Sequence, residues 1–308
     1  MDALGRVLAC TFPDLDGVSP LAVLGEGFGS LVVETAGGVV FRIGKNSQAL
    51  EGYALEERLL PVLQPHLSVP VPEPRWLMPS SEQFRFGLIG YPKLSGRPLR
   101  PDSLAARDGR RIAADVARFL YDLHRIPRDL ASAIGVSGPP DPRLSNVEEV
   151  RDEVMPALGD ILAGPEQRRM SQWWDWFLED DRMRQYEPVV RHGDLWYEHI
   201  LVDHSVTNVI GVLDFEDTAI GDPAVDFATQ LYIGRDFARL VVDGYAGLGG
   251  VVDPFVWHRM ERLQVLRELR GLRSAIRLDD QPEIEMSVDK LRTTSLFDVG
   301  ESSGPAFN

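Results

Sequence analysis

Two aspartates stand at the ends of two short, apolar and β-rich runs in the second half of the chain. Asp194 follows residues 188–191, and Asp214 follows residues 209–213. Such runs predict strands, and an adjacent pair of strands would present both carboxylates together. A protein that transfers a phosphoryl group needs at least one carboxylate that accepts a proton and one that holds a metal ion. The pattern therefore predicts phosphoryl-transfer chemistry.

Length and composition predict a protein of two lobes. The chain has 308 residues, of which 44% are apolar, so it can bury a large core and reaches the length at which single cores tend to divide. Its one cysteine, Cys10, cannot form an internal disulfide, and the first residues lack a basic segment followed by a long apolar one. We therefore expect a cytoplasmic protein.

Charge and hydropathy argue against nucleic acid and membranes as partners. No stretch approaches the roughly 18 uninterrupted apolar residues that a membrane span requires, and no block of lysine and arginine suggests a nucleic-acid surface. The formal charge of −15 disfavours polyanions and would attract small cations to an acidic cleft. The plainer interpretation is that an acidic surface serves solubility. The oligomeric state cannot be predicted from these features.

A glycine-rich segment, residues 25–30, lies between two apolar runs near the N-terminus. A second strand-like run follows the glycines, whereas a dinucleotide-binding loop would open a helix, so we reject a Rossmann fold. A glycine hairpin tip can lay backbone N–H groups against nucleotide phosphates, because no Cβ keeps the anion away. We expect Gly25, Gly27 and Ser30 to contact the nucleotide, although an ordinary glycine hairpin has the same pattern.

A basic residue on the next strand faces a predicted helix. Residues 39–43 predict a third strand, and residues 47–63 predict a helix with one apolar face. If the helix packs on the sheet, its carboxylate Glu56 can reach Arg42, and this is the pair that we favour. Lys45 is the neighbouring alternative, but it lies beyond the strand, where its side chain would point into solvent.

The remainder of the chain reads as mostly helical. A proline-rich connector at residues 70–74 and a strand at 86–91 complete the first part, which we assign as an N-terminal nucleotide-binding lobe of residues 1–93. Residues 94–308 form the predicted helical lobe for catalysis and substrate binding. Its helices are predicted at residues 107–125, 147–162, 166–178, 224–245, 254–278 and 282–296.

Two segments carry a resemblance to a known family. Residues 192–202 and 211–227 closely resemble the central motifs of the aminoglycoside phosphotransferase family, which also includes macrolide kinases. Weaker resemblance extends to residues 24–27, 41–45, 53–60, 90–94 and 120–124, and so covers most of the chain. The resemblance implies an α+β, bilobal, protein-kinase-like fold with a β-rich N-lobe and a mostly helical C-lobe.

The resemblance implies roles for three residues of the central motifs. Asp194 matches the catalytic aspartate that orients the acceptor hydroxyl and receives its proton. Asp214 matches the carboxylate that holds Mg²⁺ against the nucleotide phosphates. His199 stands where most kinases of this superfamily have asparagine, as in aminoglycoside 2″-kinases and macrolide kinases. Because magnesium prefers oxygen ligands, His199 would bind it through water or favour a softer ion such as Mn²⁺.

The resemblance also implies a nucleotide site. Arg42 stands where many relatives have a phosphate-binding lysine. The planar guanidinium of Arg42 thus replaces the compact ammonium group of lysine. Lys93 and Leu94 match the backbone edge that pairs with the purine of ATP or GTP. Glu216 replaces the glycine of the Asp-Phe-Gly triplet of protein kinases, which argues against regulation by a mobile loop.

Other polar and aromatic residues are better interpreted as structural. His192 is expected to bond a backbone carbonyl, and Asp222 and Asp226 are expected to brace the central loop and the following helix. Trp173, Trp174 and Trp176 share one predicted helix with several acidic residues. A packed helix is the favoured interpretation of that pattern, and an acidic rim for a polyamine sugar is its alternative.

These features together predict a small-molecule kinase that transfers the γ-phosphoryl group of ATP or GTP to a hydroxyl of an aminoglycoside. A macrolide kinase or a metabolic sugar or amino-alcohol kinase is the nearest alternative. A metal-dependent hydrolase could be built from His192, Asp194, His199 and Asp214, but it would leave the glycine hairpin and Arg42 without a role. A nucleotide-binding module without catalysis is the third alternative, motivated by Arg42 and His199.

Overall fold

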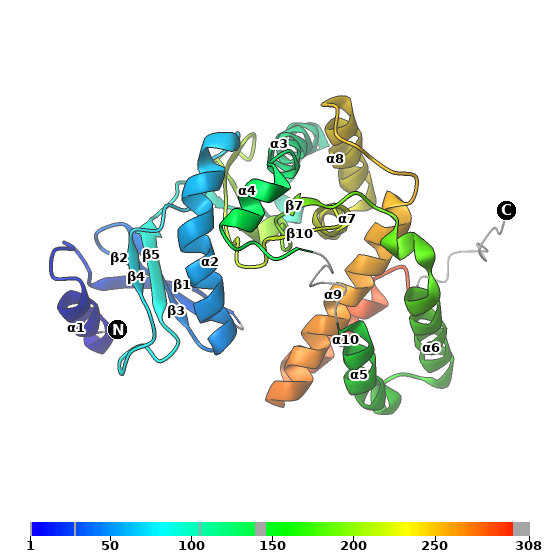
Figure 1. The fold of residues 1–308 in the computed structure, drawn as a ribbon. Coiled ribbons are helices and arrows are strands. Elements are labelled where there is room, and N and C mark those ends of the chain that lie inside the picture. The colour runs from blue at the N-terminus through cyan, green and yellow to red at the C-terminus, as the bar shows by residue number, and fades with distance from the viewer. Residues whose placement is uncertain (1, 28, 105, 139–145, 298–308) are drawn as a thin grey trace. The chain divides into compact units, whose positions relative to one another are not determined.

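The computed structural model describes residues 2–27, 29–104, 106–138 and 146–297, so Phe28 of the glycine-rich segment lies outside the described residues. The chain divides into two compact units (Figure 1). The first unit comprises residues 1–142 and 188–251, and the second comprises residues 143–187 and 252–308. The proposed lobe boundary at residues 93 and 94 is a different division, and it stays a prediction.

The N-terminal part of the first unit is an antiparallel sheet of five strands in the order β1-β2-β3-β5-β4, preceded by the helix α1 (Asp2–Thr11). Its strands are β1 (Pro20–Glu26), β2 (Ser30–Thr35), β3 (Val39–Gly44), β4 (Trp76–Met78) and β5 (Leu88–Pro92). The predicted hairpin at the glycine-rich segment and the third strand are confirmed, whereas the short strand β4 was not predicted. Val39, Phe41 and Leu88 form the core between this sheet and Leu8 of α1.

Helix α2 (Ser47–Leu63) packs against strands β3 and β5 and has the predicted bounds (Figure 1). It begins where the Asn46 side chain accepts a hydrogen bond of 3.0 Å from the Ala49 N–H, which satisfies one of the unpaired N–H groups of the first turn. A single turn, η1 (Gln64–His66), follows its end. Its buried face includes the polar residue Glu56 beside Tyr53, so the sheet-facing side of α2 carries a charge into the interior.

Short strands hold the central motifs of the first unit. β7 (Val189–Arg191) pairs with β10 (Ala219–Gly221), and β9 (Val209–Val212) pairs with β8 (Ile200–Val202), which in turn pairs with β6 (Arg97–Pro98). The prediction that the strands before Asp194 and Asp214 form an adjacent pair is therefore wrong. β8 and β9 are consecutive in the chain and pair as a hairpin, and β7 pairs with β10 instead.

The helices of the first unit surround these strands. α3 (Ala106–His124) packs along α8 (Arg235–Gly247), and α4 (Arg128–Ala133) and η2 (Pro101–Ser103) are short. The predicted single helix over residues 224–245 is wrong, because the structure has α7 (Ala224–Ala228), η5 (Thr229–Tyr232) and then α8. Gly234 separates η5 from α8 with a φ of 138°, which an L side chain rarely adopts.

The second unit is helical in its described residues. It contains α5 (Val147–Ile161), α6 (Gly164–Glu179), η3 (Asp181–Arg184), α9 (Val256–Leu278) and α10 (Gln281–Arg292). Helix α9 packs against both α5 and α10, and Arg277 forms an ion pair of 2.5 Å with Glu153 between α9 and α5. Among the described helices of the whole chain, none is long and apolar enough to cross a membrane.

Candidate functional site

The predicted pair of Arg42 and Glu56 is confirmed. Arg42 on β3 is 6% exposed and Glu56 on α2 is fully buried, and Arg42 Nη1 donates to both oxygens of Glu56 at 2.9 and 3.1 Å. Glu56 Oε1 also accepts the Phe215 N–H at 2.8 Å. The pair therefore links the sheet, α2 and the segment that follows β9. Lys45, the alternative, pairs instead with the exposed Glu26 at 2.9 Å.

The second arm of the Arg42 guanidinium binds two further carboxylates. Arg42 Nη2 donates to Asp214 Oδ1 at 3.0 Å and to Glu216 Oε2 at 2.7 Å. A guanidinium has five N–H groups; Nη1 serves both oxygens of Glu56, and Nη2 serves Asp214 and Glu216. A phosphate oxygen that approaches Nη2 must therefore compete with Asp214 and Glu216.

Glu216 is the site residue that sequence reasoning did not assign. A Cβ on Gly52 of α2 would lie 2.7 Å from Glu216 Cβ, so α2 approaches the chain here only because residue 52 is glycine. Gly29 of the hairpin also faces the carboxylate, since a Cβ there would lie 3.7 Å from Glu216 Oε1. The signal in the sequence was the glutamate itself, an acidic residue two positions after Asp214 in an apolar run.

The three carboxylates around Arg42 differ in their pKa. Burial opposes ionisation of Asp214, but the charge of Arg42 outweighs it and holds the pKa of Asp214 below its ordinary value. Burial and the nearby charge of Asp214 raise the pKa of Glu216 to about 8. Asp214 also has a φ of 67°, in the left-handed region that aspartate tolerates better than most residues. The site thus keeps Asp214 as the ionised carboxylate.

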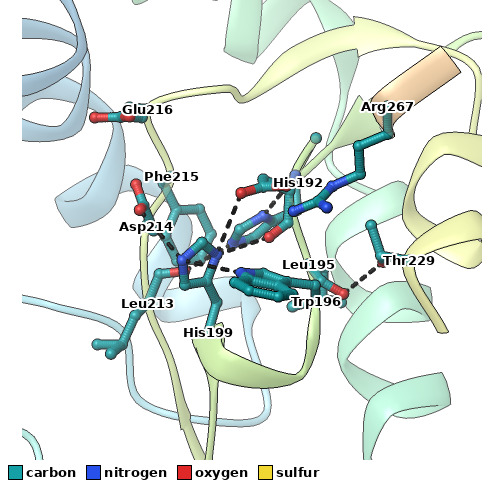
Figure 2. A network of polar contacts seen from close by, with 12 residues as sticks. His192, Leu195, Trp196, His199, Leu213, Asp214, Phe215, Glu216, Thr229 and Arg267 are labelled. Atoms are coloured by element: carbon teal, nitrogen blue, oxygen red, sulfur yellow. Dashed lines mark hydrogen bonds and ion pairs between the residues drawn. The ribbon is translucent and has the colours of Figure 1, made fainter. Parts of the chain in front are cut away.

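The loop that carries Asp194 is fixed through its backbone. The buried Asp226 carboxylate accepts the N–H of His192 at 2.9 Å and the N–H of Gly193 at 2.8 Å. Gly193 has a φ of 92°, and a Cβ there would lie 2.3 Å from the Asp217 carbonyl oxygen, so only glycine fits. Beyond Asp194, the Leu195 carbonyl accepts from the side chain of Thr229 at 2.5 Å (Figure 2).

His192 and Asp226 are structural, as predicted. His192 Nε2 donates to the Leu213 carbonyl at 3.0 Å, and its Nδ1 accepts the Asp194 N–H at 3.2 Å, so the ring ties the two aspartate segments together. Burial lowers the pKa of His192, which keeps the imidazole neutral for this pair of bonds. His124 Nε2 lies 3.0 Å from Asp226 Oδ2 and supports the brace from α3.

His199 lies between the two aspartates. Its Nδ1 donates to the Asp194 carbonyl at 2.8 Å and lies 3.6 Å from Asp194 Oδ2, while its Nε2 lies 3.4 Å from Asp214 Oδ2. Figure 2 shows the ring of His199 between Asp214 and Trp196, and both of these side chains approach its Nε2. The expected convergence of Asp194 and Asp214 is therefore confirmed, although a single imidazole rather than a pair of neighbouring strands joins them.

The glycine hairpin brings its predicted residues to different environments. A Cβ on Gly25 or Gly27 would have no heavy atom within 4 Å, so the space beside both residues is open, although the Gly27 N–H already donates to the Ser30 carbonyl at 2.9 Å. The Ser30 hydroxyl is buried and lies 2.6 Å from the hydroxyl of Tyr53 on α2. In this arrangement Ser30 anchors the end of the hairpin to α2.

The predicted purine edge follows β5. The Lys93 N–H donates to the Gly38 carbonyl at 2.8 Å, and the Lys93 side chain pairs with Glu34 at 2.7 Å. Successive peptide groups of an extended strand point to opposite sides, so the Pro92 carbonyl and the Leu94 N–H face away from β3. The sheet has thus already engaged the N–H of Lys93, while Leu94 offers the better placed donor.

The tryptophans of the second unit lie mostly in its core. Trp173 and Trp174 of α6 are 7% and 1% exposed, as the packed-helix interpretation predicts, whereas Trp176 is 54% exposed. Asp180 at the end of α6 forms a hydrogen bond to His258 and an ion pair of 2.8 Å with Arg182. This acidic group is therefore neutralised within the unit and contributes little to an acidic rim.

Comparison with known proteins identifies the family. The model of a phosphotransferase enzyme family, APH, matches residues 21–263. The chain belongs to this family. The predicted enzyme class, a phosphotransferase, is confirmed by that match. No sequence among curated proteins matches the chain.

Solved structures of phosphotransferases share the fold. APH(2″)-IIIa in complex with GDP and kanamycin is 24% identical, with a TM-score of 0.82 over 93% of this chain and 96% of that one. A mutant of aminoglycoside 2′-phosphotransferase-IIIa in complex with GDP is 25% identical, with a TM-score of 0.81 over 93% and 94%. Macrolide 2′-phosphotransferase MphH from Brachybacterium faecium is 25% identical, with a TM-score of 0.67 over 95% and 99%. The predicted α+β, kinase-like fold is confirmed.

Proposed function

We propose that the chain transfers the γ-phosphoryl group of ATP or GTP to a hydroxyl of an aminoglycoside. The observation that carries the proposal is the placement of the Asp194 and Asp214 carboxylates around His199, at 3.6 and 3.4 Å from its two nitrogens. A proton acceptor and an ionised metal-binding carboxylate on two fixed segments suit an in-line transfer, which depends on positioning and on stabilising charge.

Asp194 is proposed as the proton acceptor. Its backbone is held on both sides, by Asp226 at Gly193 and by Thr229 at Leu195, so its carboxylate has few alternative positions. Its side chain is 23% exposed, which leaves room for an acceptor hydroxyl to approach. Asp194 would orient this hydroxyl and take its proton as the oxygen attacks phosphorus.

Asp214 and His199 fit a divalent cation shared with the nucleotide. Asp214 Oδ2 and His199 Nε2 are 3.4 Å apart, close to the roughly 3 Å between adjacent ligands that lie about 2.1 Å from one metal ion. The described residues contain no cluster of three or more histidine, cysteine, aspartate or glutamate side chains suited to a metal. Phosphate oxygens and water would supply the remaining ligands of the cation. Mg²⁺ accepts such a set, and the imidazole favours Mn²⁺. When bound, the cation would neutralise charge on the phosphates.

The nucleotide is proposed to lie against the glycine hairpin and the end of β5. The open space beside Gly25 and Gly27 would receive the phosphates, and the Pro92 carbonyl and the Leu94 N–H would face the purine. Arg42 and Glu56 hold β3 and α2 around this site, and Ser30 fixes the hairpin end. Both ATP and GTP are compatible with these contacts.

An aminoglycoside is favoured as acceptor because it is a polycation and the chain has a formal charge of −15. A macrolide is the second candidate, since MphH, named as a macrolide 2′-phosphotransferase, is 25% identical over 95% of this chain. The hydrolase alternative loses support because both ring nitrogens of His192 already bond to Leu213 and Asp194, so His192 has no lone pair for a metal.

A coupled nucleotide-consumption assay tests the proposal. Aminoglycosides, macrolides and simple amino alcohols are offered as acceptors, with ATP and GTP in parallel, and mass spectrometry identifies the phosphorylated product. Kanamycin-like compounds should stimulate nucleotide consumption, whereas selective stimulation by erythromycin-like compounds would replace the aminoglycoside with a macrolide. Nucleotide binding without phosphorylation of any acceptor would overturn the proposal and favour a binding module.

A further inference from the structure

We propose that Trp196 is a positioning residue that holds the metal-facing nitrogen of His199 and must release it when a divalent cation binds. This inference rests on the proposed function of the same site. The Trp196 indole Nε1 lies 3.4 Å from His199 Nε2, and the two rings are nearly perpendicular, with 87° between their planes (Figure 2). The indole N–H therefore points at the nitrogen that faces Asp214.

The tautomer of His199 follows from its other nitrogen. The Asp194 carbonyl oxygen can only accept a hydrogen bond, and it lies 2.8 Å from His199 Nδ1, so Nδ1 carries a proton. The indole N–H of Trp196 can only donate, so His199 Nε2 must carry a lone pair to receive it. The two neighbours together select a neutral imidazole whose lone pair is on the side of Asp214.

This lone pair has two competing partners. Asp214 Oδ2 is also an acceptor and lies 3.4 Å from His199 Nε2, so the two atoms can share a cation but not a hydrogen bond while Nε2 is unprotonated. A cation that binds directly takes the lone pair, and a water molecule on the cation that donates to Nε2 takes it as well. In both cases the indole N–H of Trp196 loses its acceptor.

The response to a cation is confined to side chains. The backbone around Trp196 is fixed by hydrogen bonds from the Trp196 N–H to the Asp194 carbonyl at 2.9 Å and from the His199 N–H to the Trp196 carbonyl at 3.0 Å. The indole also packs against the ring of Tyr197, with 4.8 Å between ring centroids. Cation binding therefore changes the polar surroundings of the indole without moving the catalytic loop, and tryptophan fluorescence should report it.

Fluorescence titration of Trp196→Phe with Mn²⁺ and with Mg²⁺ tests the inference. The phenyl ring keeps an aromatic side chain but has no N–H, and Trp176→Phe, which removes the exposed tryptophan of α6, is the matched control. Each protein is first saturated with a non-hydrolysable nucleoside triphosphate. The wild type and Trp176→Phe should show a cation-dependent fluorescence change that Trp196→Phe lacks. Loss of a neutral hydrogen bond corresponds to about two- to tenfold in affinity, so Trp196→Phe should bind the cation that much more tightly when its affinity is measured by isothermal titration calorimetry.

A second variant distinguishes loss of the contact between Trp196 and His199 from a folding defect. His199→Asn removes the imidazole lone pair and should also abolish the cation-dependent signal of Trp196, while the far-ultraviolet circular dichroism stays that of the wild type. An unchanged signal in Trp196→Phe, or weaker cation binding by it, would overturn the inference. Phosphoryl transfer without the Trp196 signal rejects only the role of Trp196. A clear signal without transfer to any acceptor rejects only the proposed function.

Discussion

The backbones of the segments that carry Asp194 and Asp214 both bond to buried side chains, but the two carboxylates are held differently. The Asp194 loop is fixed by hydrogen bonds from its backbone, above all to the fully buried Asp226. The Asp214 segment bonds through its backbone to Glu56, and its side chains also join ion pairs around Arg42, in which Asp214 and Glu216 remain 26% and 24% exposed. A proton acceptor gains from a single fixed position. A site for a triphosphate and its cation must instead exchange ionic partners when the ligands arrive.

Asp194→Asn should produce the largest effect, and it tests the loop whose backbone is held by Asp226. The amide cannot accept the proton of the acceptor hydroxyl, so the turnover number should fall by about 10²- to 10⁴-fold. The nucleotide dissociation constant, measured by calorimetry, should stay near that of the wild type. Asp243→Asn, an exposed change of the same chemistry on α8, should leave both values unchanged. Turnover within a few-fold of the wild type in Asp194→Asn would remove Asp194 from its proposed role.

The same comparison explains what the sequence could predict. Local periodicity placed Arg42 on one face of its strand and Glu56 on one face of its helix, so their pairing followed from two nearby elements. The partners of β7 and β9 and the joining of Arg42 to Asp214 depend on contacts between distant segments, the latter 172 residues apart. Periodicity carries no information on such pairings. The motifs identified both aspartates and His199, but not that the His199 imidazole lies between the two carboxylates.

The break in the predicted helix over residues 224–245 has the same origin. Thr229 and Gln230 turn their side chains to the Leu195 carbonyl, at 2.5 and 2.6 Å, and the chain adopts a tighter turn there. Thr229 and Gln230 thus hold the Asp194 loop in place. No sequence pattern within residues 224–245 indicates this contact with a distant segment. Departures from local prediction thus mark residues that support the site.

Asp226→Asn should produce the next largest effect, because it loosens the fixed loop without touching the reacting atoms. The amide offers one acceptor oxygen where the carboxylate offers two, so one of the N–H groups of His192 and Gly193 loses its buried partner. We expect turnover to fall by about 10- to 100-fold, since small misplacements of a catalytic group have effects of that size. The free energy of unfolding should fall by about 1–3 kcal/mol in urea titrations. A normal turnover number in a destabilised Asp226→Asn protein would mean that the brace serves folding alone.

Glu216→Gln should produce a smaller effect and should strengthen ligand binding rather than weaken function. It tests the ion pairs around Arg42. Glu216 shares the Nη2 group of Arg42 with Asp214, and above its pKa of about 8 it adds negative charge where the phosphates are proposed to lie. Removing that charge should tighten nucleotide binding without metal by about two- to fivefold at about pH 9 and have less effect at about pH 7, where Glu216 is mostly protonated. Isothermal titration calorimetry measures this change, with Glu57→Gln on the exposed side of α2 as the matched control. Weaker binding by Glu216→Gln would show that Glu216 assists the nucleotide rather than competing with it.

The smallest predicted effect concerns pH and the fixed loop. Burial lowers the pKa of His192 below its ordinary 6.5, against the opposing attraction of Asp226, Asp194 and Asp214. The unfolded chain therefore binds more protons between the two pKa values, and stability rises with pH in that window. The contribution is fully present above about pH 6.5 and is lost as the pH falls. For a single histidine the loss cannot exceed about 1.4 kcal/mol at about pH 5.5.

His192→Gln isolates this contribution. Glutamine keeps a donor for the Leu213 carbonyl but has no proton to gain in this range, so its free energy of unfolding should fall less than that of the wild type between about pH 7.5 and pH 5.5. Urea titrations at the two pH values give the difference directly. Equal pH dependence in both proteins would mean that His192 keeps its ordinary pKa in the folded state. The loop would then tolerate a charged imidazole, and Asp226 rather than the neutral ring of His192 would hold the loop in place.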